Sequence, residues 1–249
     1  MKKKKIIFTR REAIITGMAT LSGLALSGCS KKAPPTYGNI LRMGDALTYI
    51  AHRTLLPGQS LAMEYQQGDI SSFPATGTTN PGDASKGSYS KTYSEFHSRG
   101  FSDWNLKVEG SVSKPGSYSL AQLHNFPSRT QITRHTCEEG WTAIGEWTGV
   151  PVSVILQHAG IKPSARYVNF YAYDGFMESI DLMDAFHPQT ILAYGMNGRN
   201  LPLQHGAPVR LRVETQIGYK SVKYLERIVV SDEFVDLYGD TGWSWYTGI

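Results

Sequence analysis

The sequence predicts a single α+β domain built on a mixed sheet. Short alternating or β-branched apolar runs recur from residue 106 to residue 230, glycine and proline turns separate them, and only a few short segments show helical periodicity. The 249 residues, 41% of them hydrophobic, suffice for one packed core. No internal repeat or heptad pattern occurs in the sequence, which argues against a solenoid or a coiled coil.

The first elements of this domain follow from periodicity and turn residues. Leu106 and Val108 alternate before a Lys-Pro-Gly turn, so residues 106–110 are expected to form a strand. Residues 120–124 have the pattern of a short helix, and residues 130–136 have that of a strand that leads into a cysteine.

Glycine and proline set the elements that follow. Residues 147–151, Trp-Thr-Gly-Val-Pro, predict a turn, after which Pro151 begins a helix that ends at the next glycine. Alternating residues on each side of Asp174-Gly175 predict a hairpin of residues 167–173 and 176–182. A helical turn and four strands complete the domain. The turn covers residues 182–187, and the strands cover 191–194, a segment that begins at Leu201, 208–213 and 224–230.

Residues 1–28 have the pattern of an export signal peptide. A basic cluster and Arg10-Arg11 precede a mostly uncharged run that is shorter than the ~20 residues of a spanning helix. The run ends in Leu26-Ser27-Gly28-Cys29, which is similar to a bacterial lipobox, so Cys29 is expected to carry a lipid and to become the mature N-terminus. The arginine pair fits a twin-arginine export signal, or it only extends an ordinary secretory signal.

Between the signal and the domain, the chain is expected to form a tether and an extension. Residues 29–38 are polar and predict a tether, and residues 39–103 predict an N-terminal extension of the domain at 104–249. Within the extension, residues 39–56 show loose helical periodicity. Residues 73–93 are rich in Gly, Ser, Thr, Asn and Pro, which predicts a long loop over the domain or a flexible excursion.

The distribution of charge excludes nucleic acid as a partner. The chain has a net charge of +4, but the residues before Cys29 carry six Lys or Arg and one Glu, a net of +5, so the remainder is near −1. Its basic residues are scattered rather than gathered into a stripe. With Cys29 lipidated, Cys137 has no partner for an intrachain disulfide, so stability must come from a packed core.

The lone thiol of Cys137 allows three interpretations. It is a buried thiol that fills space, a nucleophile with His135 or His205 as its base, or a thiolate ligand of a metal. Zinc is a poor candidate for that metal. The sequence has no second cysteine nearby, no CxxC or HExxH motif, and no ligand spacing among its seven histidines.

A second constellation lies at residues 205–223. Along a strand Arg210 and Arg212 share one face, while the apolar residues that alternate with them share the other. The glycine loop that follows adds Lys220, Lys223 and exposed backbone amides. Forked donors and a close backbone suit a phosphate-bearing ligand. The alternative is a solvated basic face of a strand.

A set of collinear motifs runs from about residue 104 to residue 231. The motifs are Cys137-Glu-Glu-Gly-Trp141, Trp147-Thr-Gly-Val-Pro151, Tyr173-Asp-Gly, His187-Pro, Ala193-Tyr-Gly-Met-Asn-Gly, Leu201-Pro, His205-Gly-Ala-Pro-Val-Arg210 and residues 218–223. Together they resemble the molybdopterin-binding domain of the sulfite oxidase family. The resemblance implies a mixed-sheet α+β molybdopterin-binding fold and a molybdenum with molybdopterin (Mo-molybdopterin) as the cofactor. Around the cysteine the sequence is most similar to bacterial periplasmic members, methionine-sulfoxide reductases among them.

The resemblance also implies roles for individual residues. Cys137 would ligate molybdenum beside the dithiolene sulfurs of the pterin. Tyr246 is similar to the tyrosine near the metal in sulfite oxidases and would donate a hydrogen bond or proton to the leaving oxygen, or else it packs the tail. The residues implied to bind the pterin, its phosphate or both are His205, Arg210, Ser221, Val222 and Lys223.

Two departures from sulfite oxidases bear on the substrate and the assembly. Those enzymes place arginines soon after the cysteine, whereas Glu138 and Glu139 follow Cys137 here, and carboxylates that face the pocket would disfavour a dianion such as sulfite. The chain ends at Ile249 without the dimerisation or haem domain of animal sulfite oxidases. We therefore expect a monomer that exchanges electrons with a separate haem- or quinone-linked protein.

The leading hypothesis is a lipid-anchored oxidoreductase on the periplasmic face of a membrane, performing oxygen-atom transfer on a small or protein-bound sulfur or nitrogen oxide. A cofactor inserted before export favours the twin-arginine route, because that route carries folded proteins. One alternative is a binding lipoprotein that keeps the fold without redox activity and holds no molybdenum. The other is a thiol-dependent hydrolase or transferase that iodoacetamide inactivates without any metal.

Overall fold

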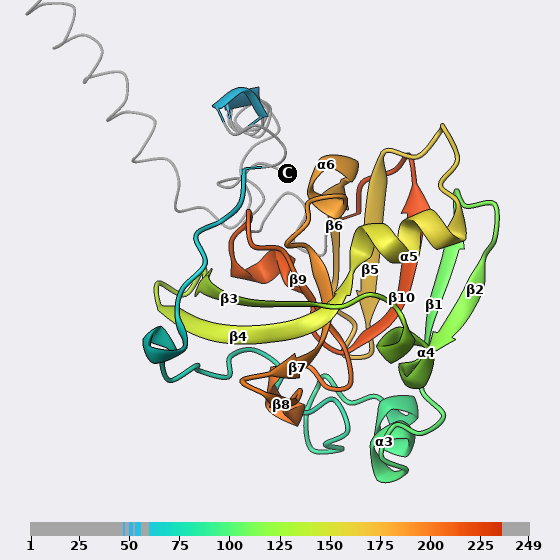
Figure 1. Ribbon diagram of the computed structural model, residues 1–249. Helices are drawn as coiled ribbons and strands as arrows, with labels where there is room; N and C mark the ends of the chain where they lie inside the picture. The colour runs from blue at the N-terminus through green and yellow to red at the C-terminus, as the bar shows by residue number, and fades with distance from the viewer. Residues whose placement is uncertain (1–46, 48–49, 52, 56–59, 236–249) are drawn as a thin grey trace, which may run out of the picture.

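The computed structural model describes residue 47 and residues 50–51, 53–55 and 60–235. The expected signal peptide, the lipidated Cys29, the tether and Tyr246 lie outside these residues. Of the segment expected to be helical at 39–56, the described residues are helical. The rest of the described chain folds as two β-sheets with short helices around them (Figure 1). Among the described helices, none is long and apolar enough to cross a membrane.

The first sheet is mixed because one pair of its neighbouring strands is parallel. Its strand order is β2-β1-β10-β5-β6. Strand β1 pairs in parallel with β10, and the other neighbours are antiparallel. The strands are β1 (Asn105–Gly110), β2 (Gly116–Ser119), β5 (Tyr167–Ala172), β6 (Met177–Asp181) and β10 (Leu225–Ser231).

The second sheet is antiparallel and carries part of the candidate site at its ends. Its order is β3-β4-β7-β8, with β9 paired to β7. In Figure 1 the long strands β3 and β4 curve past the end of β9. The strands are β3 (Arg129–Thr136), β4 (Thr142–Pro151), β7 (Ile191–Met196), β8 (Arg199–Asn200) and β9 (Arg210–Arg212).

The described helices are short, and their ends are set by identifiable caps. Ser119 and Gln122 form a reciprocal capping box at the start of α4, and α5 ends at Gly160 in the left-handed region. The α-helices are α3 (Lys91–Ser98), α4 (Leu120–Asn125), α5 (Val152–Ala159) and α6 (Leu182–Ala185). The 3-10 helices are η1 (Gln67–Asp69), η2 (Leu203–His205) and η3 (Gly218–Lys220).

The main core joins the first sheet to α5 and to residues that precede the sheet. From α5, Ile155 and Leu156 are fully buried, and burial of each side chain contributes about 1.5–3 kcal/mol. Tyr93, on α3, is also fully buried and donates a hydrogen bond of 2.6 Å to the carbonyl of Ala207. Helix α3 of the N-terminal extension is therefore built into the same core as the strands.

The α+β fold with a mixed sheet is confirmed, and two local predictions are wrong. Residues 147–151 are the end of β4 rather than a turn. A Cβ at Gly149 would lie 2.1 Å from the carbonyl oxygen of Leu192, so glycine here permits close strand pairing. Leu201 does not begin a strand, because β8 has already ended at Asn200. The predicted loop at 73–93 contains no strand, but α3 begins within it.

Candidate active site

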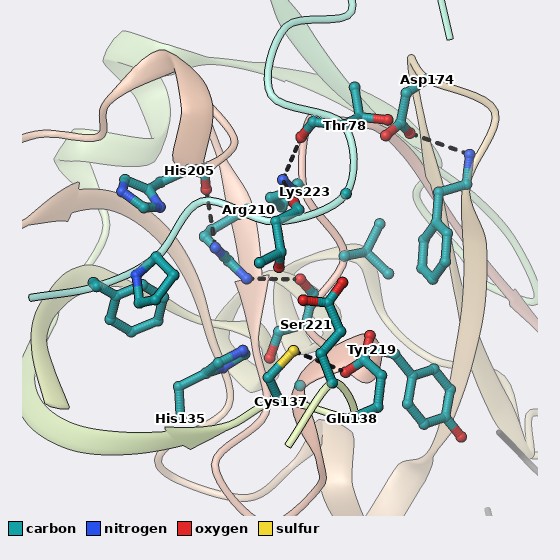
Figure 2. Close-up of a pocket in the computed structure, with 18 of the residues that line it drawn as sticks. Thr78, His135, Cys137, Glu138, Asp174, His205, Arg210, Tyr219, Ser221 and Lys223 are labelled. Carbon is teal, nitrogen blue, oxygen red and sulfur yellow. Dashed lines mark hydrogen bonds between the residues drawn. The ribbon is translucent and has the colours of Figure 1, made fainter. Parts of the chain in front are cut away.

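A cavity of about 630 Å³ opens where the carboxyl end of β3 meets the loops around β9. Four stretches of chain line it, and they are far apart in the sequence (Figure 2). They are residues 73–78, residues 135–141, the β5–β6 turn at 174–176 and residues 205–223. The sheets hold these stretches in register, so the cavity wall is set by the fold.

Cys137 follows β3 directly and lies on a tight turn in the cavity wall. Its amide donates to the carbonyl of Trp141 at 2.9 Å, and the amide of Gly140 donates to the carbonyl of Cys137 at 3.1 Å. Gly140 has a φ of 90°, which a residue with a side chain rarely adopts. The turn thus fixes a buried thiol at the edge of the cavity.

The surroundings of this thiol disfavour the nucleophile interpretation. Burial raises the pKa of Cys137, and the carboxylates of Glu138 and Glu139 raise it further, against a backbone amide that lowers it. Sγ donates its hydrogen bond to Glu138 Oε2 at 3.6 Å rather than to an imidazole. A nucleophilic cysteine needs the opposite environment, with cations that favour the thiolate. Bound to a metal cation, the same sulfur would lose its proton to coordination.

His135 is held as a neutral ring by an arginine. Arg212 Nη1 lies 2.6 Å from His135 Nδ1, and a guanidinium only donates, so Nδ1 accepts. Burial, and then the charge of Arg212, lower the pKa of His135 far below its ordinary value. A Cβ at Gly218 would lie 2.6 Å from His135 Nε2. The glycine loop can therefore approach this ring only because residue 218 has no side chain.

Arg210 and Arg212 lie over one face of Trp147 but differ in their partners. Their Cζ atoms lie 5.1 and 4.4 Å from the ring centroid. Arg212 forms two hydrogen bonds with the Glu214 carboxylate, at 3.0 and 2.7 Å. The hydrogen bonds of Arg210 within the described chain go only to carbonyl oxygens, including those of His205 at 3.0 Å and Ser221 at 2.9 Å.

Arg210 is consequently a buried cation in need of an anion. It is 4% exposed and lines the cavity. Burial, and then the charge of Arg212, lower its pKa to about 9. A cation that remains protonated at neutral pH in such a position is stabilised by a bound anion, and its fork of donors suits a phosphate.

Lys223 ties the segment at 76–78 to the cavity wall. Its ammonium donates to the carbonyls of Thr76 at 2.7 Å, Thr78 and Gln204 at 3.4 Å. Burial, and then Arg210, lower the pKa of Lys223 to about 8. The sequence implied a cofactor contact for this residue, and here its three donors hold the loop that lies over the cavity.

The other residues implied to bind the cofactor line the same cavity. Burial, followed by the charges of Arg210 and Lys223, lowers the pKa of His205 to about 4, so this ring is neutral at pH 7. Ser221 and Val222 are buried beside it in the cavity wall. Thus the structure brings all these residues together with Cys137, while their roles as ligands stay predictions.

Lys220 is a correction to the sequence analysis, which placed it among the cations of the site. It is fully buried and points away from the cavity, with Nζ 2.7 Å from Glu178 and 3.0 Å from the carbonyl of Ser179. Its ammonium is paired with the carboxylate of Glu178 in the core. Only Lys223 of the two loop lysines lines the cavity.

Sequence reasoning missed Phe73, which is central to the aromatic wall. Its ring lies 5.2–5.7 Å from those of four other residues. These residues are His135, Trp141, Trp147 and His205. A lone phenylalanine in a polar loop was the available signal, but its partners are 62 or more residues away and no local pattern reveals them.

The residues present fit the cofactor that the resemblance implies. Among the described residues, the cavity combines the soft thiol of Cys137, the buried Arg210 whose hydrogen bonds go only to carbonyls, and Gly218, which approaches His135 closely because it has no side chain. Thiolate suits the metal, and the arginine suits the phosphate of a pterin. Within the described residues, no group of three or more His, Cys, Asp or Glu side chains could hold a metal ion.

The chain is similar to a known family and to a solved structure. A family model described as the oxidoreductase molybdopterin binding domain matches residues 94–238. In the solved sulfane dehydrogenase SoxCD of Paracoccus pantotrophus, the similar part has a TM-score of 0.52 and 26% identity, and it covers 55% of this chain and 40% of that one.

Curated relatives carry names from protein-methionine-sulfoxide reduction. YedZ1 of Azospira oryzae, named as a subunit of such a reductase, is 41% identical over 144 residues, which cover 57% of this chain and 55% of that protein. The catalytic subunit MsrP of Xanthomonas axonopodis pv. citri is 29% identical over an alignment 259 residues long, which covers 95% of this chain and 73% of that protein. The chain thus spans little more than half of the first relative.

Proposed function

This chain belongs to the oxidoreductase molybdopterin-binding family, and from that premise we propose that it reduces a sulfoxide by oxygen-atom transfer. The cofactor of this family is Mo-molybdopterin, which supplies the two-electron chemistry that protein side chains lack. The observation that carries the proposal is one cavity lined by both the Cys137 thiol and the buried guanidinium of Arg210. The names of the relatives support sulfoxide as the substrate class.

The side chains of this site would bind, orient and exclude water. Cys137 would ligate the metal, and Arg210, which lines the cavity, would bind the phosphate of the pterin with N–H groups beyond those that it donates to carbonyls. The neutral ring of His205 offers a hydrogen bond without adding charge. Phe73 and the rings around it would form an aromatic part of the cavity wall and limit the access of water there.

The reaction needs a reductant from outside the chain. A sulfoxide that gains two electrons and two protons gives a sulfide and water. The electrons would come from a separate electron-transfer protein, haem- or quinone-linked. The carboxylates of Glu138 and Glu139, which line the cavity, oppose the binding of sulfite and so favour reduction of a neutral sulfoxide over oxidation of that dianion.

We also propose a location for the protein in the cell. Residues Leu26-Ser27-Gly28-Cys29 and Arg10-Arg11 support export by the twin-arginine route and a lipid anchor on Cys29 at the periplasmic face of a membrane. Mass spectrometry of the mature N-terminus tests this, since a diacylated or triacylated cysteine is expected and an unmodified chain would refute the anchor.

The test of the function is molybdenum per chain and sulfoxide turnover. Protein from a host that makes the cofactor should hold near-stoichiometric metal and reduce a methyl sulfoxide with a reduced dye as electron donor. Cys137→Ala should abolish turnover and leave the fold intact. A well-folded wild-type sample without metal, from a host that loads a known molybdoenzyme, would refute the proposal and support the binding lipoprotein.

A further inference from the structure

Three carboxylates line the candidate active site, and each is held by a donor. Glu138 Oε2 accepts from the Cys137 thiol at 3.6 Å, and Glu139 Oε2 accepts from Trp141 Nε1 at 3.3 Å. Across the cavity, Asp174 accepts from the amide of Phe176 at 3.1 Å in the β5–β6 turn. Figure 2 shows Glu138 and Asp174 on different sides of the cavity.

The cations of the site offset only part of the charge of these carboxylates, through the charge of Lys223 near Asp174 and Glu139. Among the described residues, none of Glu138, Glu139 and Asp174 forms an ion pair, whereas Arg212 is paired with Glu214. Lys223 uses its donors on carbonyl oxygens. Once Arg210 has bound the phosphate of the cofactor, the charged side chains left among the described residues of the cavity wall are these three carboxylates and the ammonium of Lys223, a net charge of −2.

The three carboxylates lie nearer to solvent than Arg210 does, and Lys223 is partly exposed like two of them. Arg210 is buried, whereas Glu139 is exposed and Glu138 and Asp174 are partly exposed. A substrate entering from solvent therefore meets carboxylates before it reaches the sulfur of Cys137. Glu138 and Glu139 directly follow Cys137 in the chain. A sulfoxide group that approaches the sulfur of Cys137 therefore also comes close to these two carboxylates.

Aromatic faces complete the outer wall. Trp141 and Phe176 line the cavity beside the carboxylates that they hold, and Tyr219 lines it from η3. Aromatic faces bind thioether and methyl groups, and they attract cations. Carboxylates and aromatic rings together are a surface for an S-methyl group that lies near a positive charge.

We infer that this site selects sulfoxides that stand next to a positive charge, such as a methionine sulfoxide flanked by lysine or arginine in a peptide, and disfavours sulfoxides flanked by carboxylates. This inference rests on the proposed reduction of sulfoxides and names the class of substrate within it.

The test compares three acetylated and amidated tripeptides of methionine sulfoxide, flanked on both sides by lysine, glutamine or glutamate. With the metal-loaded enzyme and a reduced dye, kcat/KM should fall about three- to tenfold at each step from lysine to glutamine to glutamate at low salt. Raising the ionic strength to about 0.5 M should compress these ratios, because salt screens partly exposed charges.

Variants assign the preference to the carboxylates. Glu138→Gln with Glu139→Gln should reduce the lysine-to-glutamate ratio at least about threefold, while the glutamine peptide, which carries no charge, serves as the reference for damage to the site. Glu95→Gln is the matched control. Glu95 is an exposed glutamate on α3 outside the cavity, and its substitution should leave the ratio unchanged.

The outcomes separate the inference from the function. Equal rates for the three peptides, or a preference that survives removal of both glutamates, would overturn the inference and leave sulfoxide reduction standing. Metal-loaded enzyme that reduces none of the peptides would overturn the proposed function and the inference together. If the double variant fails to fold, the peptide series and its salt dependence on the wild-type enzyme still decide the charge preference.

Discussion

Arg210 and Arg212 allow a direct test of which buried cation is kept for a ligand. Both lie over Trp147 and both are nearly inaccessible, but of the two only Arg212 has a carboxylate partner within the part of the chain that the structure describes. We expect Arg210→Met to change the stability of the cofactor-free protein little and to lower its cofactor content strongly. Arg212→Met should instead act first on the fold itself, by lowering the free energy of unfolding of the cofactor-free protein.

The magnitudes follow from burial and hydrogen bonds. Burial lowers the pKa of Arg210 to about 9 from an ordinary 12.5. Because the folded pKa lies below the unfolded one, the full penalty acts at every pH below about 9, and it amounts to about 5 kcal/mol at pH 7. The two shorter of its three charge-assisted hydrogen bonds to carbonyls return about 1.5–3 kcal/mol each. The two contributions nearly cancel, so Arg210→Met should change the free energy of unfolding by less than about 2 kcal/mol.

For Arg212 the balance differs because its partner is buried too. Removal of the guanidinium leaves the carboxylate of Glu214, 1% exposed, without its two arginine hydrogen bonds. Such a loss costs about 3–5 kcal/mol. Urea denaturation of protein made without the cofactor measures both values, and molybdenum per chain in a competent host measures retention. If Arg210→Met cost more than about 3 kcal/mol and kept its molybdenum, the assignment of Arg210 to the ligand would be refuted.

Three further outcomes are expected from single side chains. Gly218→Ala should destabilise the protein by about 1–3 kcal/mol in urea denaturation, because the added Cβ would clash with the imidazole of His135. Gly87→Ala is the control and should not destabilise it, since a Cβ there meets nothing within 4 Å. Equal effects of the two substitutions would contradict the clash. Lys220→Met should cost about 3–5 kcal/mol, because it removes the ammonium that pairs with the buried carboxylate of Glu178. Lys223→Met should instead speed amide hydrogen exchange in the segment that its ammonium holds, and similar exchange in both variants would count against this division. The pKa of His205 is about 4 in the fold against 6.5 when unfolded, so the unfolded state binds more protons and the stability should fall from pH 6.5 to 4. His205→Gln should reduce that fall by at most about 3 kcal/mol. If the variant has the same dependence of stability on pH as the wild type, the ring titrates normally.

The elements that sequence predicted well are those whose signal is local. The Asp174-Gly175 hairpin and the capped α4 and α5 depend on residues within a few positions of one another. Strand β4 was missed because Gly149 and Pro151 indicate a turn locally. In the fold, that glycine is required by the approach of β7, more than forty residues later.

The candidate site shows the same division. Collinear motifs indicated Cys137, His205 and Arg210 from the sequence, and the structure places them around one cavity. Lys220 and Lys223 are equivalent in the sequence, three residues apart on one loop. Lys220, the last residue of η3, enters the core to meet Glu178, and Lys223 follows the helix and faces the cavity.

The sequence by itself determined the α+β class, the family and the residue types that can hold a metal and a phosphate, since these follow from local pattern and from the order of motifs. Only the tertiary structure decided which buried charges are already paired, which lysine faces the cavity, and that Phe73 and three carboxylates line it. The physical reason is that burial and electrostatic pairing depend on partners brought close by the sheets from distant parts of the chain. The free energy of a buried charge depends on those partners, and a local pattern does not contain them.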